Sequence, residues 1–283
     1  MAAAECSFAG HLTDGISRAV ASSTADVSVE IVGVTKHYRT AKSGTVHALD
    51  EVSISFKPGE FVSIVGPSGC GKSTLMMLIS GLIPASSGTI RVGAKEVRGP
   101  VREAGIVFQR DVLLDWRSVL SNVMLPVEIR GLDPASYLKK ARELLQSVGL
   151  AEFEEKYPGE LSGGMRQRVS ICRALVQQPG LLLMDEPFGA LDALTREQMN
   201  LDLQRMWLRD RNTVLFITHS IEEAVFLSDR VVVMSARPGT VSEVLDIELA
   251  RPRGASTRSD RKFVEYIERI RRRFFAQGIL SES

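Results

Sequence analysis

The chain has 283 residues, of which 44% are hydrophobic and 24% charged, and its formal net charge is +1. This composition fits one large folded domain with appendages, and the charge gives no reason to expect nucleic acid or an acidic membrane as partner. The cysteines Cys6, Cys70 and Cys172 are far apart, which argues against a disulfide framework or zinc site and favours a reducing compartment. No apolar run approaches the roughly 18 residues of a membrane span, and the N-terminus lacks signal-peptide features. We therefore expect a cytosolic chain that reaches a membrane only through a partner.

The first half of the chain is predicted to be rich in strands. Residues 1–28 are expected to form a mobile tail, because Ala and Ser are abundant there and no clean periodicity is visible. Apolar runs bounded by Gly, Pro or charged residues then predict strands at 29–34, 52–56, 61–65, 89–92 and 105–108. From about 113 to 165 the apolar spacing becomes helical, and Gly149 stands where a helix should end. A helical block thus interrupts a strand-rich region.

The second half alternates strands and helices. The continuous apolar runs at 181–185 and 213–218 are typical of strands buried on both faces of a parallel sheet, with a helix at 195–210 between them. Ser220 and Glu223 have the spacing of a capping box at the start of another helix. Further signals predict a strand at 231–235, a turn at Pro238–Gly239 and a basic helix at 259–275.

A phosphate-binding loop is the strongest local motif. The stretch from Gly66 to Ser73 matches G-x-x-x-x-G-K-[ST], and it lies between a predicted strand and a predicted helix. Glycine backbone N–H groups and a helix N-terminus bind phosphate, while Lys72 supplies a charge and the Ser73 hydroxyl a Mg²⁺ ligand. The alternative, an accidental Gly-rich turn, is disfavoured by this context. The predicted nucleotide-binding residues are Gly66, Pro67, Ser68, Gly69, Cys70, Gly71, Lys72, Ser73 and Thr74.

Two adjacent carboxylates end the apolar run at 181–185. Strand C-termini face the ligand crevice of such sheets, so Asp185 is positioned to hold Mg²⁺. Neighbouring strand residues alternate faces, so Glu186 points elsewhere and can accept a proton from an attacking water. A solvated strand end is the alternative, and it is the weaker one downstream of a phosphate-binding loop.

Further motifs make the assignment more specific. The sequence LSGGMRQR at 161–168 resembles the signature of the ATP-binding cassette (ABC) ATPases. In family order, Tyr38 resembles the aromatic residue that stacks on adenine, Gln109 the Q-loop glutamine, residues 190–192 the D-loop, and His219 the switch histidine. Each of these has a structural alternative when taken alone: a packing tyrosine, a turn or a core histidine. Their common order and spacing over residues 29–240 favour the functional interpretation.

The resemblance implies an α/β P-loop NTPase fold with a mostly parallel core sheet, an antiparallel β subdomain and a helical signature subdomain. It places an ABC ATPase domain at 29–250 and leaves a basic helical tail at 251–283. ATP and Mg²⁺ are the implied cofactors. Carried over from the family, the catalytic residues are Glu186, His219, Gln109 and Lys72, and the metal-binding residues are Ser73, Gln109 and Asp185. The resemblance also implies that Asp192 binds the nucleotide, and that Ser162, Gly163 and Gly164 complete the ATP site of a second copy packed head to tail.

The segment at 108–131 resembles the nitrate, sulfonate and taurine importers within this family. The resemblance implies import of a small anion or organic solute at the cytoplasmic face of the inner membrane. Membrane permease subunits are the direct partners and a solute-binding protein an indirect one; nucleic acid is not expected. The solute itself is not specified by the sequence. Two positions depart from the family pattern: Met165, where many relatives have Gln, and Asp115, where many have Pro.

The apolar residues Val112, Leu113, Leu114 and Trp116 form a candidate groove for a permease helix, or part of the core. The basic C-terminal segment is expected to be a solvated helix, with contact to anionic lipid headgroups as the alternative. Two other classes compete with the importer: a soluble ABC ATPase acting on nucleic acid or ribosomes, and a nucleoside-type kinase. The first usually carries two cassettes, a coiled coil or zinc cysteines, and the second has no use for a signature sequence.

Overall fold

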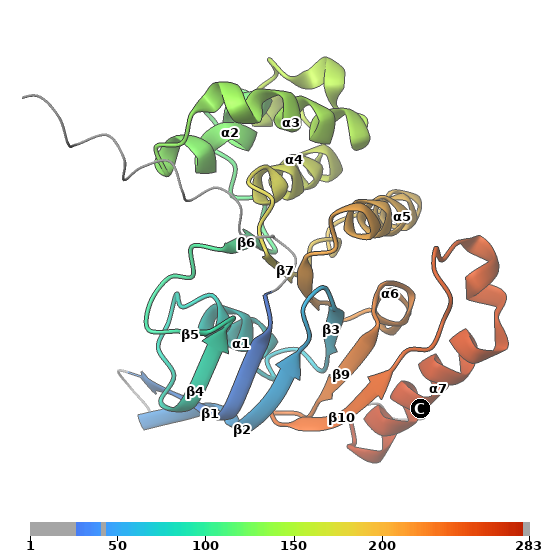
Figure 1. Ribbon diagram of the computed structural model, residues 1–283. Helices are drawn as coiled ribbons and strands as arrows, with labels where there is room; N and C mark the ends of the chain where they lie inside the picture. The colour runs from blue at the N-terminus through green and yellow to red at the C-terminus, as the bar shows by residue number, and fades with distance from the viewer. Residues whose placement is uncertain (1–26, 41–43, 280–283) are drawn as a thin grey trace, which may run out of the picture.

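The computed structural model describes residues 27–40 and 44–279. The predicted mobile tail lies almost entirely outside these residues. Among the helices of the described part, none is long and apolar enough to cross a membrane. Two sheets, a group of helices above them and a C-terminal helix at one side make up the molecule (Figure 1).

The smaller sheet is antiparallel, with strand order β2-β1-β4-β5. Its strands are β1 (Val29–Thr40), β2 (Gly44–Phe56), β4 (Ser87–Val92) and β5 (Lys95–Glu96). At the end of β2, Val52, Ile54 and Phe56 are buried while the residues between them are exposed. This alternation is that of a sheet with one face on the core and one in water. The buried face packs against α1 (Lys72–Ile79).

The larger sheet has strand order β10-β9-β3-β8-β7-β6, and all its pairs are parallel except β10 with β9. Its strands are β3 (Phe61–Val65), β6 (Ala104–Val107), β7 (Leu181–Asp185), β8 (Thr213–Ile217), β9 (Arg230–Met234) and β10 (Val241–Asp246). Every residue of β3 and β8 is buried. The parallel sheet predicted from the continuous apolar runs is therefore confirmed, whereas β10 was not predicted.

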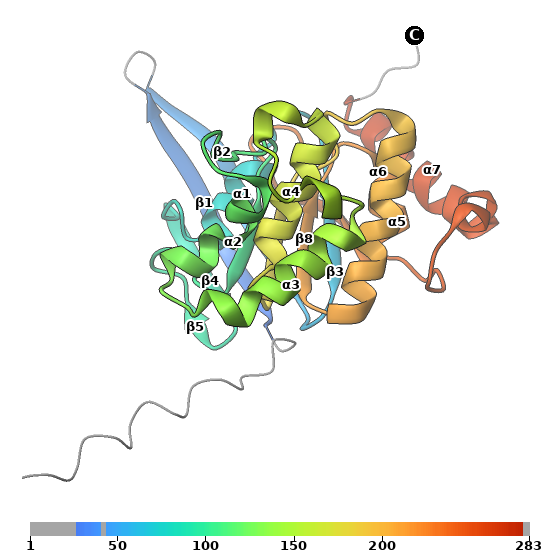
Figure 2. The same ribbon diagram turned by 90° about the horizontal axis from the view of Figure 1, so that it is seen from above.

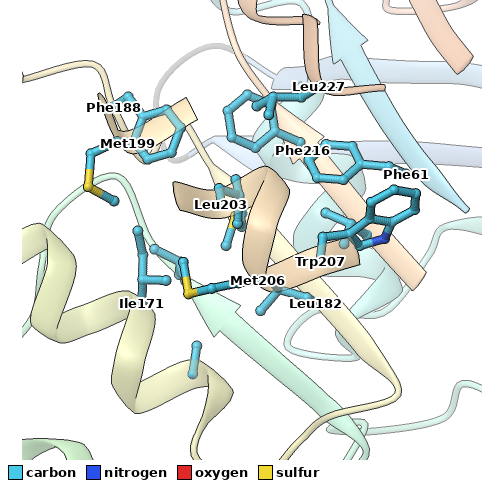
Figure 3. Close-up of a cluster of buried hydrophobic side chains, with 14 of the residues drawn as sticks. Phe61, Ile171, Leu182, Phe188, Met199, Leu203, Met206, Trp207, Phe216 and Leu227 are labelled. Carbon is cyan, nitrogen blue, oxygen red and sulfur yellow. The ribbon is translucent and has the colours of Figure 1, made fainter. Parts of the chain in front are cut away.

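Helices α5 (Ala193–Asp210) and α6 (Ile221–Leu227) cover the face of the larger sheet opposite α1. Figure 3 shows the aromatic centre of this layer, where Phe61 and Phe216 from the sheet meet Trp207 of α5. The rings of Phe61 and Trp207 meet edge to face with centroids 5.7 Å apart. Buried aromatic pairs of this kind stabilise a core beyond the area that they bury, by about 1 kcal/mol. The ends of the strands that carry the site are thus held on a rigid base.

The helical block consists of α2 (Val119–Ile129), α3 (Pro134–Ser147) and α4 (Gly163–Leu175), with short 3₁₀ turns η1 (Ala151–Phe153) and η2 (Pro158–Glu160) (Figure 2). Helix α2 begins at Val119 rather than near 113. The reason is that the buried Asn122 amide binds the backbone of Leu114, Arg117 and Ser118, which holds this stretch in a loop. Gly149 follows α3 with φ of 72°, as predicted for the residue after a helix.

The C-terminal segment forms a 3₁₀ turn, η3 (Ala255–Ser259), and helix α7 (Arg261–Ala276). Its charge predicted a solvated helix, and this prediction is wrong for one face. There, Phe263, Ile267, Ile270 and Phe274 are buried in the same core as α6. Ahead of it, the buried guanidinium of Arg253 donates to the carbonyls of Val225, Phe226 and Ser228 at the end of α6. These hydrogen bonds anchor the C-terminal segment to the end of α6.

Candidate functional site

The loop between β3 and α1 forms a cradle for an anion. Gly69 and Gly71 have φ of 74° and 104°, and a Cβ on Gly71 would lie 2.6 Å from the side chain of Leu49. Glycine is therefore required at Gly71 by both conformation and space. No side chain caps α1, so the N–H groups of its first turn remain for a ligand. The buried Lys72 ammonium donates to the carbonyls of Gly66 and Pro67 at 2.9 and 3.0 Å, inside the same loop.

Asp185, the last residue of β7, meets the loop through a side-chain hydrogen bond with Ser73. Burial raises the pKa of this carboxyl, and the neighbouring Glu186 adds to the effect, whereas the Ser73 hydrogen bond and Lys72 oppose it. A divalent cation bound at this position would offset such a burial cost. The described residues contain no cluster of three or more His, Cys, Asp or Glu that could hold a metal. One hydroxyl and one carboxylate fit Mg²⁺, which takes its other ligands from water and substrate phosphates.

Two of the predicted catalytic residues, Gln109 and His219, meet at a carboxylate oxygen of a third, Glu186. Oε2 of Glu186 accepts from the Gln109 amide at 3.2 Å and lies 3.4 Å from Nδ1 of His219. Glu186 has φ of 45°, and its backbone N–H donates to Ile217 at the end of β8. Glu186 and Asp185 have different side-chain partners, but Glu186 lies outside β7, so the alternation of strand residues does not explain the difference. Residues from three loops, after β6, β7 and β8, thus meet at one edge of the sheet.

Tyr38 lies on β1 beside the first turn of α1. Its hydroxyl is 3.4 Å from the Thr74 hydroxyl, and the Lys36 ammonium lies 5.1 Å from the ring centroid. The structure therefore brings Tyr38 next to the phosphate-binding loop, although the two are far apart in the sequence. A flat aromatic ring at this distance from a phosphate cradle is suited to stacking on a nucleotide base.

The signature residues form a second, separate group. Ser162 caps α4 by accepting from the Met165 N–H at 3.3 Å, and Asp192 caps α5 by accepting from the Thr195 N–H at 3.0 Å. The two helix starts, with Gly163 and Gly164, line a pocket of about 390 Å³. Over residues 27–40 and 44–279, no hydrogen bond or ion pair joins this pocket to the phosphate-binding loop. The predicted nucleotide-binding residues are thus divided between two surfaces.

Comparisons with known proteins decide the family. The model of the ABC transporter family matches residues 49–189. The chain is 50% identical over 233 residues to the taurine import ATP-binding protein TauB of Rhizobium johnstonii, which covers 80% of this chain and 88% of that protein. It is 43% identical over 242 residues to TauB of Escherichia coli K12, and this match covers 84% of this chain and 95% of that protein. The chain belongs to the ABC transporter family.

A solved structure supports the same assignment at the level of the fold. The dimeric, post-hydrolysis structure of an ATP-binding cassette bound to ADP and phosphate matches with a TM-score of 0.70 and 32% identity, covering 78% of this chain and all of that one. The fold predicted from the motifs is confirmed. The protein is an ABC ATP-binding subunit and an ATPase. The alternative of a non-transport ABC ATPase is not favoured, since these curated relatives are named as import proteins.

Two contacts of this ABC subunit were not predicted from the sequence. The Arg237 guanidinium donates to the Gly69 carbonyl through Nε at 3.1 Å and through a terminal nitrogen at 2.9 Å, which braces the phosphate-binding loop. The Arg166 guanidinium, on the signature helix, binds Asp111. The only sequence signal was that both arginines lie in family-like motifs, since neither partner is near in the chain.

The apolar residues after Gln109 divide between surface and core. The side chains of Val112 and Trp116 are 51% and 75% exposed, whereas Leu113 packs against the core. Leu114 is half-buried. The core interpretation therefore holds for Leu113, whereas Val112 and Trp116 are at the surface, where the docking of a permease helix stays a prediction.

Proposed function

We propose that the protein is the ATPase subunit of an importer for a small sulfonate such as taurine, or for a related small solute such as nitrate. It acts at the cytoplasmic face of the membrane, where it binds permease subunits, and a solute-binding protein delivers the solute to the permease. Support for the solute class comes from the names of the TauB relatives, which this chain matches over most of their length. Nucleic acid is not a partner in this proposal.

The division of the nucleotide-binding residues into two surfaces is the observation that carries the mechanism. One surface has the phosphate-binding loop, Asp185 and Glu186, and the other has Ser162 and Asp192 at two helix starts. We infer that two copies pack head to tail, so that the Ser162 surface of one copy closes over the phosphate-binding loop of the other. Helix N-termini favour negative charge, which suits the α4 start for the terminal phosphate of ATP.

The cis surface binds and orients the nucleotide. Tyr38 stacks on the adenine, and the backbone of residues 66–71 with Thr74 surrounds the phosphates. Lys72 exchanges its carbonyl partners for the phosphate oxygens, which a strongly charged ammonium prefers. Ser73, Asp185 and Gln109 would hold Mg²⁺, which would neutralise charge on the phosphates.

Glu186 accepts the proton of the attacking water. The water oxygen bonds to the γ-phosphorus, the bond from that phosphorus to the oxygen bridging to the β-phosphate breaks, and ADP leaves with the bond's electron pair. Glu186 passes the proton to the departing phosphate. His219 and Gln109, which both contact Glu186, hold the carboxylate and the water in line.

The exposed residues after Gln109 connect the site to the permease. Gln109 contacts Glu186, and the loop that follows it presents Val112 and Trp116 at the surface. We propose that a short permease helix docks on these two side chains and follows the movement of the loop as the dimer closes on ATP and opens after hydrolysis.

Co-expression with a candidate permease and growth of a deletion strain test this function. The expected results are co-purification with the permease, and loss of growth on taurine, an alkanesulfonate or nitrate as sole sulfur or nitrogen source. Restoration by the wild-type gene, but not by a Trp116→Glu variant with normal basal ATPase activity, separates permease docking from catalysis. Normal growth of the deletion strain on all three solutes contradicts the proposed solute class.

A further inference from the structure

A buried carboxylate of α6 is tied to the backbone on both sides of His219. Glu223 is 6% exposed, and its Oε2 accepts from the Thr218 hydroxyl at 2.6 Å. The same hydroxyl oxygen accepts from the Ser220 N–H at 3.0 Å. Thr218 and Ser220 flank His219 in the chain, so Glu223 fixes the peptide that carries the histidine.

The other oxygen of this carboxylate faces the loop that carries Asp192. Oε1 of Glu223 lies 3.6 Å from Nε of Arg196, in the first turn of α5. A terminal nitrogen of Arg196 donates to the Leu191 carbonyl at 3.0 Å, immediately before Asp192. One carboxylate therefore links the loop after β8, through its hydrogen bond with Thr218, to the loop before α5, through an ion pair with Arg196 whose Nε makes no hydrogen bond.

Glu223 is not needed to start its own helix. The sequence predicted a capping box, but only half of it forms: the Ser220 hydroxyl accepts from the Glu223 N–H at 3.3 Å, whereas the Ser220 N–H is bound by Thr218. Burial raises the pKa of Glu223, while Thr218, Arg196, His219 and Arg258 all act to lower it. A buried acid carries a free-energy cost, and here its contacts point to the two loops rather than to the helix end.

We propose that Glu223 and Arg196 are a positioning pair that sets His219 according to the state of the Asp192 loop. In the head-to-tail dimer on which this inference rests, the partner subunit contacts the Asp192 loop. A shift of the Leu191 carbonyl then moves Arg196, Glu223 and Thr218 together, so closure of the dimer adjusts the position of His219, whose Nδ1 lies 3.4 Å from Glu186 in the single chain. Coupling through a chain of packed polar groups has this physical form.

Glu223→Gln and Arg196→Gln test the pair. Glutamine still accepts from Thr218 but lacks the charge that holds Arg196, so the path is cut without removing the side chain. We expect each variant to lower kcat about tenfold and to leave KM for ATP within about twofold. The double variant should be no slower than the slower single variant, and Arg196→Lys should recover part of the loss. Arg205→Gln on the same helix, where an exposed arginine pairs with Asp202, is the matched control and should match wild type.

Dimer formation is measured separately, with Glu223→Gln added to Glu186→Gln. We expect the doubly substituted protein to dimerise on ATP as Glu186→Gln does, because the pair positions His219 and does not build the interface. A kcat within twofold of wild type, additive losses in the double variant, or loss of dimerisation each overturns it. If Glu186→Gln itself stays monomeric with ATP, both the proposed dimer and the proposed role of the Glu223–Arg196 pair are wrong. If it dimerises, the kcat measurements test the role of the pair separately from the dimer.

Discussion

Nε of Arg166 lies 2.9 Å from the carboxylate of Asp111. A second arginine of the signature helix, Arg173, donates to the carbonyls of Asp111 and Val112 at 2.8 Å each. Helix α4, which begins beside Ser162, is thereby fastened to the loop that begins at Gln109. We therefore expect a movement of this loop in response to the nucleotide to be passed to the signature helix.

Asp111→Asn should weaken this link. Both side chains are about one-third exposed, so the loss of folding stability should stay below about 1 kcal/mol. ATPase turnover should fall roughly fivefold, because the helix that begins beside Ser162 is then less firmly linked to the loop that begins at Gln109. Nucleotide affinity of the isolated monomer should not change. Glu143→Gln, which removes an exposed ion pair on α3, serves as the control. An equal loss of monomer affinity and turnover contradicts the prediction.

Glu186→Gln should keep ATP binding and lose hydrolysis. The amide still offers an oxygen to Gln109 but cannot take a proton from water, and the loss of a general base lowers turnover by about 100-fold or more. Size-exclusion chromatography with ATP should then show a stable dimer. Full turnover by this variant removes Glu186 from the role of base.

Ser162→Arg should block hydrolysis without weakening ATP binding by the monomer. Ser162 faces the pocket between the starts of α4 and α5 rather than the phosphate-binding loop of its own chain. A bulky cation there prevents the two copies from closing. The same substitution at the exposed Glu152 should have no effect on either measurement. If binding by the monomer falls together with hydrolysis, the trans role of Ser162 is wrong.

Asp185→Asn should make the nucleotide-free protein more stable at neutral pH while abolishing Mg²⁺-dependent turnover. Burial raises the pKa of Asp185 above the ordinary 3.8, so its charged form is penalised in the folded state. The contribution of Asp185 to the free energy of unfolding is therefore most favourable below pH 3.8, where the carboxyl is protonated. This contribution is lost as the pH rises through the raised pKa. Urea unfolding at several pH values, with Mg²⁺ chelated, should show a gain for Asp185→Asn that grows over this range and is then constant.

Asp133→Asn is the control of opposite sign. The Ser136 hydroxyl and the Ala135 N–H lower the pKa of this exposed capping residue of α3. The variant should be slightly less stable than wild type at pH 7, and the difference should vanish as the pH falls through the lowered pKa. A gain from both substitutions would point to a general effect of reduced charge instead.

Arg253→Met should destabilise the fold. Burial lowers the pKa of Arg253 to about 10, so the group remains charged at pH 7, and it donates to carbonyls at the end of α6. Without it these buried carbonyls lose their partners, and the free energy of unfolding should fall by about 3 kcal/mol or more. Arg261→Met, at an exposed ion pair of α7, should stay within about 0.5 kcal/mol of wild type. Denaturant unfolding measures both.

The sequence by itself determined the fold class and most of the candidate site. The phosphate-binding loop could be predicted because its function depends on local properties: glycines that adopt positive φ, a lysine and a helix start. The buried strands β7 and β8 could be predicted because a strand covered on both faces has no polar residue to interrupt the apolar run. Ser162 and Asp192 were identified by motif, and both cap helices in the structure.

Only the tertiary structure decided how these parts meet. Arg237 on Gly69, Arg166 on Asp111 and the bridge from Arg196 through Glu223 to Thr218 join segments whose separation in the chain no local pattern measures. The C-terminal helix looked solvated because its charges dominate its composition, yet its apolar face is buried beside α6. A loop or a helix cap depends on residues that are near one another in the sequence, so it can be predicted from the sequence. A contact between distant polar groups depends instead on how the sheets and helices pack together.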